Sequence, residues 1–120
     1  MSLEVRAQTA FSGIISPVIA ANQNDWAPAG LPTATVVRVN GGAVNRTITG
    51  IAGLSPDRLV FVVNVGTTNS VIFSDENVLS LAANRFALAN GVNLSMSKSG
   101  GSAILWYDST TGRIRALAHP

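Results

Sequence analysis

Cysteine is absent from this sequence of 120 residues, and histidine occurs once. The absence of cysteine excludes disulfides, thiolate metal sites and a cysteine nucleophile. The single histidine, His119, is next to last in the sequence, a poor position for a catalytic or metal-binding side chain because terminal residues are held weakly. The adjacent carboxylates Asp75 and Glu76 fit an exposed polar connection better than a Ca²⁺ site. We therefore expect no enzyme, no metal and no other cofactor.

Charged residues are also scarce, at 12% of the chain, about half of the ~25% typical of globular proteins. Eight basic residues against six acidic ones give a net charge of +2, and the isoelectric point near 9.9 reflects few carboxylates rather than a basic patch. The densest basic pair is Arg113 and Arg115. Nucleic-acid binding needs a basic cluster or stripe with aromatic partners, so nucleic acid is not an expected ligand.

Apolar residues are abundant by comparison. They make up 47% of the sequence, and the mean hydropathy is +0.33. A small soluble monomer with so few charges would expose much apolar surface. We therefore expect that neighbouring subunits cover part of this surface in a homo-oligomer.

No long apolar run is present. The longest stretch without charge, residues 7–24, is interrupted by Gly13, Pro17 and several polar residues, and it lacks the ~20 apolar residues of a spanning helix. It resembles at most a poor signal peptide, because Glu4 spoils the positively charged start. We expect no association with a membrane.

Most of the chain follows a β-strand pattern. Segments rich in β-branched and aromatic residues alternate with turns marked by glycine, asparagine and aspartate, and no convincing long helix is present. The expected strands are residues 35–39, 44–51, 58–65, 70–74, 85–89, 92–97, 102–107 and 112–118, the fifth and sixth joined by a hairpin at Asn90-Gly91. About eight strands with turns every 8–12 residues predict an all-β fold, either a small antiparallel β-sandwich, jelly-roll-like, or a barrel.

Residues 1–32 differ from the rest, because their apolar content has no clean period. They predict an extended arm followed by a loop, with an ordinary edge strand plus loop as the alternative, and we place the N-terminal arm at 1–24 and the β domain at 25–120. Since the arm has little room to bury its own apolar side chains, we expect a partner surface or a neighbouring subunit to cover them. The expected partner-binding residues are Leu3, Val5, Phe11, Ile14, Ile15, Val18, Ile19 and, beyond the arm, Trp26.

Trp26 lies in a polar loop, and its position allows two interpretations. Either its side chain anchors a partner, or it folds back over the end of the domain as a lid. A subunit interface is expected on strands 58–65 and 102–107, because the first is apolar on both faces and the second carries adjacent aromatics. The expected interface residues are Val60, Val62, Trp106 and Tyr107.

From about residue 25 onward the sequence resembles a β-domain found in virion proteins of tailed phages, namely tail fibres, receptor-binding proteins and capsid decoration proteins. The segments that carry the resemblance are, in order, Trp26-Ala27-Pro28-Ala29-Gly30-Leu31, Arg46-Thr47-Ile48-Thr49-Gly50-Ile51-Ala52-Gly53, Asp57-Arg58-Leu59, Val63-Asn64-Val65-Gly66, Ala82-Ala83-Asn84-Arg85-Phe86 and Trp106-Tyr107-Asp108 followed by Gly112-Arg113. The order and spacing of these segments are more specific than any one of them.

The resemblance implies a homotrimer and a structural role on the virion. A short arm before a single domain suits a decoration (cement) protein that binds the major capsid protein on the outside of the head. The alternative is a tail-fibre or receptor-binding module that contacts host glycan through its aromatic residues. An enzyme such as a depolymerase is the third hypothesis, and it lacks a carboxylate constellation.

Overall fold

The computed structural model describes residues 12–54 and 56–118. Within these residues the chain forms eight strands and three short 3-10 helices. In chain order they are β1 (Ile14–Ile15), η1 (Leu31–Thr33), β2 (Val36–Val39), β3 (Arg46–Ile48), β4 (Leu59–Asn64), β5 (Val71–Phe73), η2 (Ala82–Asn84), η3 (Ala89–Gly91), β6 (Leu94–Met96), β7 (Ser102–Asp108) and β8 (Arg113–Ala118). The β-rich class predicted from the sequence is confirmed.

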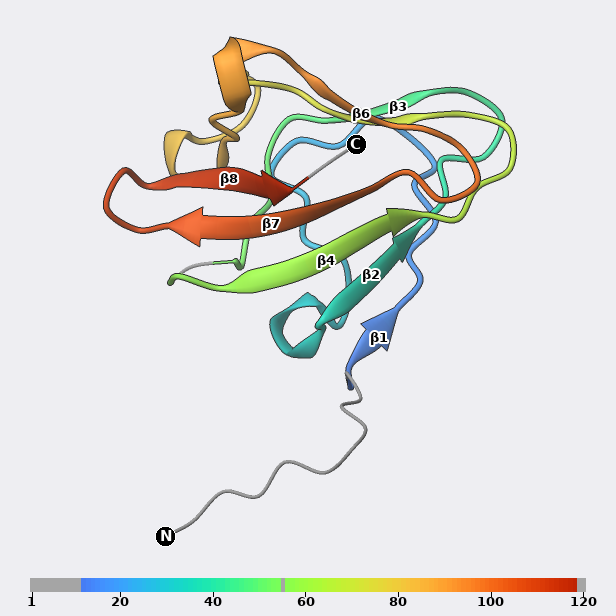
Figure 1. The fold of residues 1–120 in the computed structure, drawn as a ribbon, viewed down its shortest axis with the longest axis horizontal. Coiled ribbons are helices and arrows are strands. Elements are labelled where there is room, and N and C mark those ends of the chain that lie inside the picture. The colour runs from blue at the N-terminus through green and yellow to red at the C-terminus, as the bar shows by residue number, and fades with distance from the viewer. Residues whose placement is uncertain (1–11, 55, 119–120) are drawn as a thin grey trace, which may run out of the picture.

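The strands belong to two sheets. One has five strands in the order β1-β2-β4-β7-β8, and the other has three in the order β3-β5-β6. Figure 1 shows β3 and β6 at the top, while the five-stranded sheet descends below them from β8 to β1. The sheets do not close into a barrel, so the barrel alternative is wrong.

Both sheets are mixed, and the expectation of a purely antiparallel fold is therefore wrong. The pairs β1–β2, β2–β4 and β3–β5 are parallel. The parallel pairs arise because the chain crosses to the smaller sheet after β1, where Gln23 and Trp26 pair beside β3, and crosses between the sheets again after β2, after β3 and after β4, so it returns to each sheet in its original direction. Parallel neighbours need such a crossover, whereas hairpins join only antiparallel strands.

Two of the three parallel strand pairs join residues at the same distance in the sequence. Val36 pairs with Phe61 and Arg46 pairs with Val71, each 25 residues apart, whereas Ile14 pairs with Val36, 22 residues away. Asparagine side chains repeat the same spacing: Asn22 accepts a hydrogen bond from the backbone N–H of Thr47 at 2.9 Å, a separation of 25 residues. Asn45 accepts one from Ser70 at 2.9 Å, also 25 residues away. These amides satisfy backbone donors where the chain leaves one sheet for the other.

Residues 14–26 form the first turn of this winding. The N–H of Ile19 bonds to the carbonyl of Asn40 at 2.9 Å, and the N–H of Gln23 bonds to that of Thr47 at 2.9 Å. Gln23 and Thr49, and likewise Trp26 and Ala52, continue this pairing along the outer edge of β3. The described part of the predicted arm is thus an edge of the domain, which matches the alternative of an edge strand plus loop.

The last part of the chain is antiparallel. β6 pairs with β5, and β7 pairs with both β4 and β8. The β7–β8 hairpin turns at the predicted position, where the N–H of Gly112 bonds to the carbonyl of Asp108 at 2.8 Å. β8 has a register shift opposite Ile104 and Leu105. This irregularity leaves Leu117 exposed at the edge of the sheet.

The predicted hairpin at Asn90-Gly91 is wrong. Residues 89–91 form η3, and β6 turns to β5 for its partner. The expected strand 85–89 is reduced to isolated bridges, in which Arg85 pairs with Gly50 and Phe86 with Asp75 and Ile114. The left-handed backbone of Asn90 (φ 58°) fits the turn preference of asparagine, but here it serves a connection between sheets.

The core lies between the two sheets. It is built from the inward-facing residues of β2 to β8, with Ile19, Trp26, Leu31 and Phe86 among those added by the connections, and Ile15 of β1 packs partly buried against it. The ring centroids of Phe73 and Phe86, both members of this cluster, lie 4.8 Å apart. A core that draws on strands and connections alike ties the two sheets together through apolar burial.

One polar residue, Asn64, is fully buried at the end of β4. Its side-chain amide donates to the carbonyls of Met96 and Asn69, both at 3.0 Å. Its side-chain oxygen accepts the N–H of Gly66 at 3.0 Å. Since every polar atom of the amide is satisfied, the side chain can lie inside at little cost, and it bonds β4 to the end of β6 and to the 66–69 turn.

We predict that Asn64→Ala lowers the free energy of unfolding by about 1–3 kcal/mol, because two carbonyls and one N–H lose a buried partner. Chemical denaturation at fixed protein concentration measures this. The matched control is Ser95→Ala on the exposed side of β6, which should change stability by less than about 0.5 kcal/mol. Equal stability of the two variants would show that the amide is not needed.

Candidate functional site

The outer face of the five-stranded sheet is apolar. Along β4 the side chains of Val60, Val62 and Asn64 point into the core, so those of Leu59, Phe61 and Val63 point outward. Only side chains two residues apart share a face of a strand. All three outward residues of β4 are therefore large and apolar, and Leu59 is 42% exposed.

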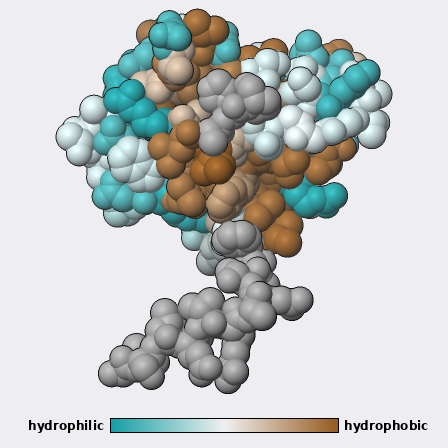
Figure 2. All heavy atoms as spheres, in the orientation of Figure 1, coloured by the Kyte–Doolittle hydropathy of each residue, from teal (hydrophilic) through white to brown (hydrophobic). Residues whose placement is uncertain are grey.

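The strand register joins these residues into a continuous row. Ile14 pairs with Val36, Val36 with Phe61, and Phe61 with Ile104, so one apolar line crosses β1, β2, β4 and β7. Leu117 is exposed beside the end of this line. Figure 2 shows the resulting band of apolar residues running over this face from β7 and β8 towards β1. We call this band the outer apolar row.

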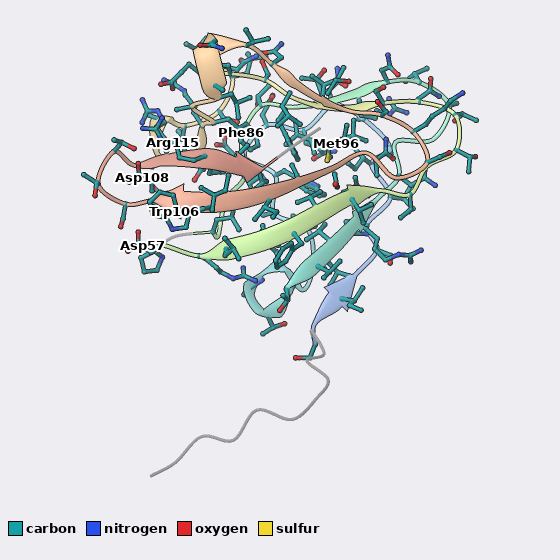
Figure 3. The ribbon with its side chains drawn as sticks, viewed as in Figure 1. Asp57, Phe86, Met96, Trp106, Asp108 and Arg115 are labelled. Atoms are coloured by element: carbon teal, nitrogen blue, oxygen red, sulfur yellow. The ribbon has the colours of Figure 1, made fainter. Side chains whose placement is uncertain are left out.

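A second row lies beside the first and is amphipathic. Leu59 pairs with Trp106, and Trp106 pairs with Arg115. Arg115 also lies 3.3 Å from a carboxylate oxygen of Asp108. Figure 3 shows Trp106, Asp108 and Arg115 together at the turn end of β7 and β8, with Asp57 close by. An aromatic ring next to a guanidinium and a carboxylate offers both a stacking surface and hydrogen-bonding groups.

The structure corrects most of the predicted subunit interface. Val60, Val62 and Tyr107 are buried in the core, and the hydroxyl of Tyr107 donates to the carbonyl of Ala83 at 2.9 Å. Trp106 alone of the four predicted residues faces outward. The sequence showed that strand 58–65 is apolar on both faces, but the choice of face was wrong.

Of the residues predicted to bind a partner, some are exposed, some are buried and some lie outside the described part of the chain. Ile14 and Val18 are exposed, at 58% and 74%. Ile15 packs partly against the core, and Ile19 is 1% exposed and belongs to the core itself. Leu3, Val5 and Phe11 lie outside the described residues, as does His119.

Trp26 is buried at 7% exposure and pairs with Ile51 at the edge of the smaller sheet. Its role as a partner anchor is therefore wrong, and the reading in which it folds back over the domain agrees with its position.

A rigid loop presents a second apolar surface, which sequence reasoning missed. Within residues 77–81 the side chains of Val78, Leu79 and Leu81 are exposed, and Val78 is 78% exposed. Three large aliphatic side chains in four residues of a connection are the sequence signal that could have revealed it. The loop carries no charged residue.

Asp25 and Ser80 hold this loop. The carboxylate of Asp25 accepts the N–H of Leu81 at 2.8 Å and the amide of Asn84 at 2.9 Å, while its own N–H donates to Ser80 Oγ at 2.9 Å. The hydroxyls of Ser80 and Thr49 lie 2.8 Å apart in the interior. Gly50 allows this close approach, because a Cβ there would lie 2.5 Å from Ser80 Oγ and from the carbonyl of Asn84. The exposed side chains therefore sit on a fixed backbone.

The described residues offer little for catalysis. They contain no group of three or more His, Cys, Asp or Glu residues placed to hold a metal ion. Asp75 and Glu76 are engaged separately, since Asp75 accepts the N–H of Leu88 at 2.6 Å and Glu76 bonds to Arg113 at 2.7 Å. A shallow depression of about 260 Å³ lies between η3, β6 and β8. Its lining includes Leu88, Val92 and Leu94 but no titratable side chain.

Comparison with known proteins gives no relative: no protein-family model, no curated protein and no solved structure matches the chain. In the described part of the chain no helix could span a membrane.

We predict that the Asp25 network weakens in acid. The hydrogen bonds from Asn84 and from the N–H of Leu81 hold the pKa of Asp25 below its ordinary value of 3.8. A carboxyl whose pKa is lowered by folding stabilises the folded state above its unfolded value, and this contribution is lost as the pH falls through the lower folded value. Thermal denaturation of wild type should therefore show a decline in stability between about pH 5 and pH 2 that is shallower in Asp25→Asn. Identical pH profiles would contradict this role.

Proposed function

We propose that this chain is a non-enzymatic structural protein of a tailed-phage virion, a decoration protein that binds the outside of the head as a homotrimer. The outer apolar row is the observation that carries the proposal. It gives the chain an apolar face whose exposure to water is unfavourable, so a partner is expected to cover it. With 12% charged residues, the chain has few groups that could bind a partner through ion pairs instead. The proposed architecture is a small β-sandwich of the two mixed sheets.

The homotrimer is proposed to form over the outer face of the five-stranded sheet, where Phe61, Val63, Ile104 and Trp106 replace most of the interface expected from the sequence. Obligate interfaces between identical subunits are apolar and resemble a domain core cut in half. Covering this face would remove the apolar excess that the composition indicates.

The major capsid protein is the proposed second partner. Ile14 and Val18 are the described residues of the expected contact that remain exposed, and the loop of residues 77–81 adds three aliphatic side chains on a rigid backbone. A protein that binds only the assembled shell stabilises it by mass action. Because these surfaces are nearly uncharged, attachment should change little with salt.

A tail-fibre or receptor-binding module that contacts host glycan is the second candidate. The position of Trp106 favours it, since the ring faces outward between Leu59 and Arg115 and near the carboxylate of Asp108. Aromatic rings beside polar side chains are a common way to hold the two faces of a sugar.

We predict that Ile104→Asp dissociates the homo-oligomer without unfolding the chain, because it places a charge within the outer apolar row. Light scattering measures the mass, and circular dichroism tests the fold. The matched control is Ser95→Asp, which adds the same charge at an exposed position of β6 in the other sheet. Wild-type mass in both variants would exclude this face as the interface.

Imaging of purified particles with an antibody fragment against the protein tests the location. A decoration protein should label the whole head in many copies, whereas a fibre module should label the tail in few. Absence of the protein from purified virions would overturn both functions.

A further inference from the structure

The sequence contains two Asn-Gly dipeptides, Asn40-Gly41 and Asn90-Gly91. In such a dipeptide the backbone nitrogen of glycine can attack the side-chain amide carbon of the asparagine, because glycine has no side chain that hinders the approach. A carbon–nitrogen bond forms, and the amide nitrogen leaves as ammonia with the proton of the attacking N–H. Water then opens the cyclic imide at either carbonyl and leaves aspartate or isoaspartate. The reaction needs only water, so the structure around each dipeptide decides where it occurs.

The first dipeptide is held in place by hydrogen bonds. The side-chain oxygen of Asn40 accepts the N–H of Gly42 at 3.0 Å, and its backbone carbonyl accepts the N–H of Ile19 at 2.9 Å. Gly41 is buried, and its carbonyl accepts the Nε–H of Arg46 at 2.9 Å. Bringing the nitrogen of Gly41 onto the side-chain amide would strain or break these bonds and move a buried peptide group. The imide can therefore form here only after a larger local opening of the domain.

The second dipeptide lies in the short helix η3, which Figure 1 draws as the orange coil at the upper margin of the molecule. Asn90 and Gly91 are both exposed. Among the described residues the side chain of Asn90 has no hydrogen-bond partner. Two backbone bonds hold the turn, from the N–H of Gly91 to the carbonyl of Leu88 at 3.0 Å and from that of Val92 to Ala89 at 3.2 Å. The side-chain amide of Asn90 is therefore open to attack once this turn opens.

The turn can open without disturbing the core, because both of its ends are fixed to the same residue. The carboxylate of Asp75 accepts the N–H of Leu88 at 2.6 Å, and the side-chain oxygen of Asn93 accepts the N–H of Asp75 at 2.8 Å. Leu88 and Leu94 on either side of the turn are buried. Opening of the residues between these anchors moves exposed groups only, and such openings require the least free energy in a folded protein.

We propose that Asn90 is a site of spontaneous deamidation in the folded protein and that the fold protects Asn40 from the same reaction. This inference does not rest on the proposed function.

Deamidation would change the surface of the depression between η3, β6 and β8. Asn90 lies in its lining with Leu88, Val92 and Leu94, and the lining contains no titratable side chain. Conversion of Asn90 places a carboxylate there and lowers the net charge of the chain from +2 by one unit. An apolar group that enters the depression would then have to displace water from a charged group, which is unfavourable. The modification therefore makes contacts at this surface dependent on the age of the protein.

The test compares folded and unfolded protein at mildly alkaline pH. Samples incubated with and without denaturant are digested, and mass spectrometry follows the mass gain of deamidation in the peptides that contain Asn40 and Asn90. The ratio of the folded to the unfolded rate is taken for each site, which removes intrinsic differences between the two dipeptides. We expect folding to slow the reaction at Asn40 by about tenfold or more relative to its effect at Asn90. Equal protection of the two sites, or greater protection of Asn90, would overturn the proposal.

Matched variants identify the modified species independently. Ion exchange of aged, folded wild type should show an acidic form that accumulates with time. This form should be lost in Asn90→Gln, because glutamine would have to close a larger ring, and should persist in Asn40→Gln. Circular dichroism checks the fold of both variants. An acidic form that persists in Asn90→Gln at the wild-type rate would overturn the proposal. Both experiments use purified protein, so absence of the protein from virions would refute the proposed function and leave this inference standing.

Discussion

Parallel pairing of segments 22 to 25 residues apart is the constraint on which the rest of the structure depends. It forces the chain to alternate between two sheets, so each strand must present apolar residues to the space between them. It also converts residues 14–26 into edges of both sheets, because they are the first turn of the same winding. The antiparallel strands β6, β7 and β8 then complete the two sheets, and Phe86 is brought into the core by a connection.

Polar side chains stabilise this winding where the chain changes sheets. Asn22 and Asn45 accept hydrogen bonds from backbone N–H groups. The amide of buried Asn64 donates to the carbonyls of Met96 and Asn69 and accepts the N–H of Gly66 in the turn. The Asp25 network fixes the long connection from β5 to β6 in the same manner. A fold of short strands has few ladder hydrogen bonds per strand, so side chains must satisfy many of the remaining backbone groups. These bonds explain why a chain poor in charge still contains many asparagine and serine residues.

The chain therefore has two distinct uses for apolar residues. Those between the sheets hold the fold, and those of the outer apolar row and the 77–81 loop remain on the surface. A rigid surface that is apolar and uncharged favours association through area rather than through ion pairs. The two salt bridges between described residues, Arg113–Glu76 and Arg115–Asp108, lie at the surface and contribute little to stability.

The sequence alone determined the β-rich class, the positions of most strands and the presence of two apolar faces on residues 58–65, because alternation and turn residues are local signals. It did not determine the parallel pairing, since the partner of a strand lies 25 residues away and leaves no local trace. For the same reason it misplaced the hairpin at Asn90-Gly91. Only the tertiary structure decided which face of β4 is inside, because Asn64 can be buried only where Met96, Asn69 and Gly66 satisfy its amide. The candidate site followed from that choice, since burying Val60 and Val62 left Leu59, Phe61 and Val63 to form the outer surface.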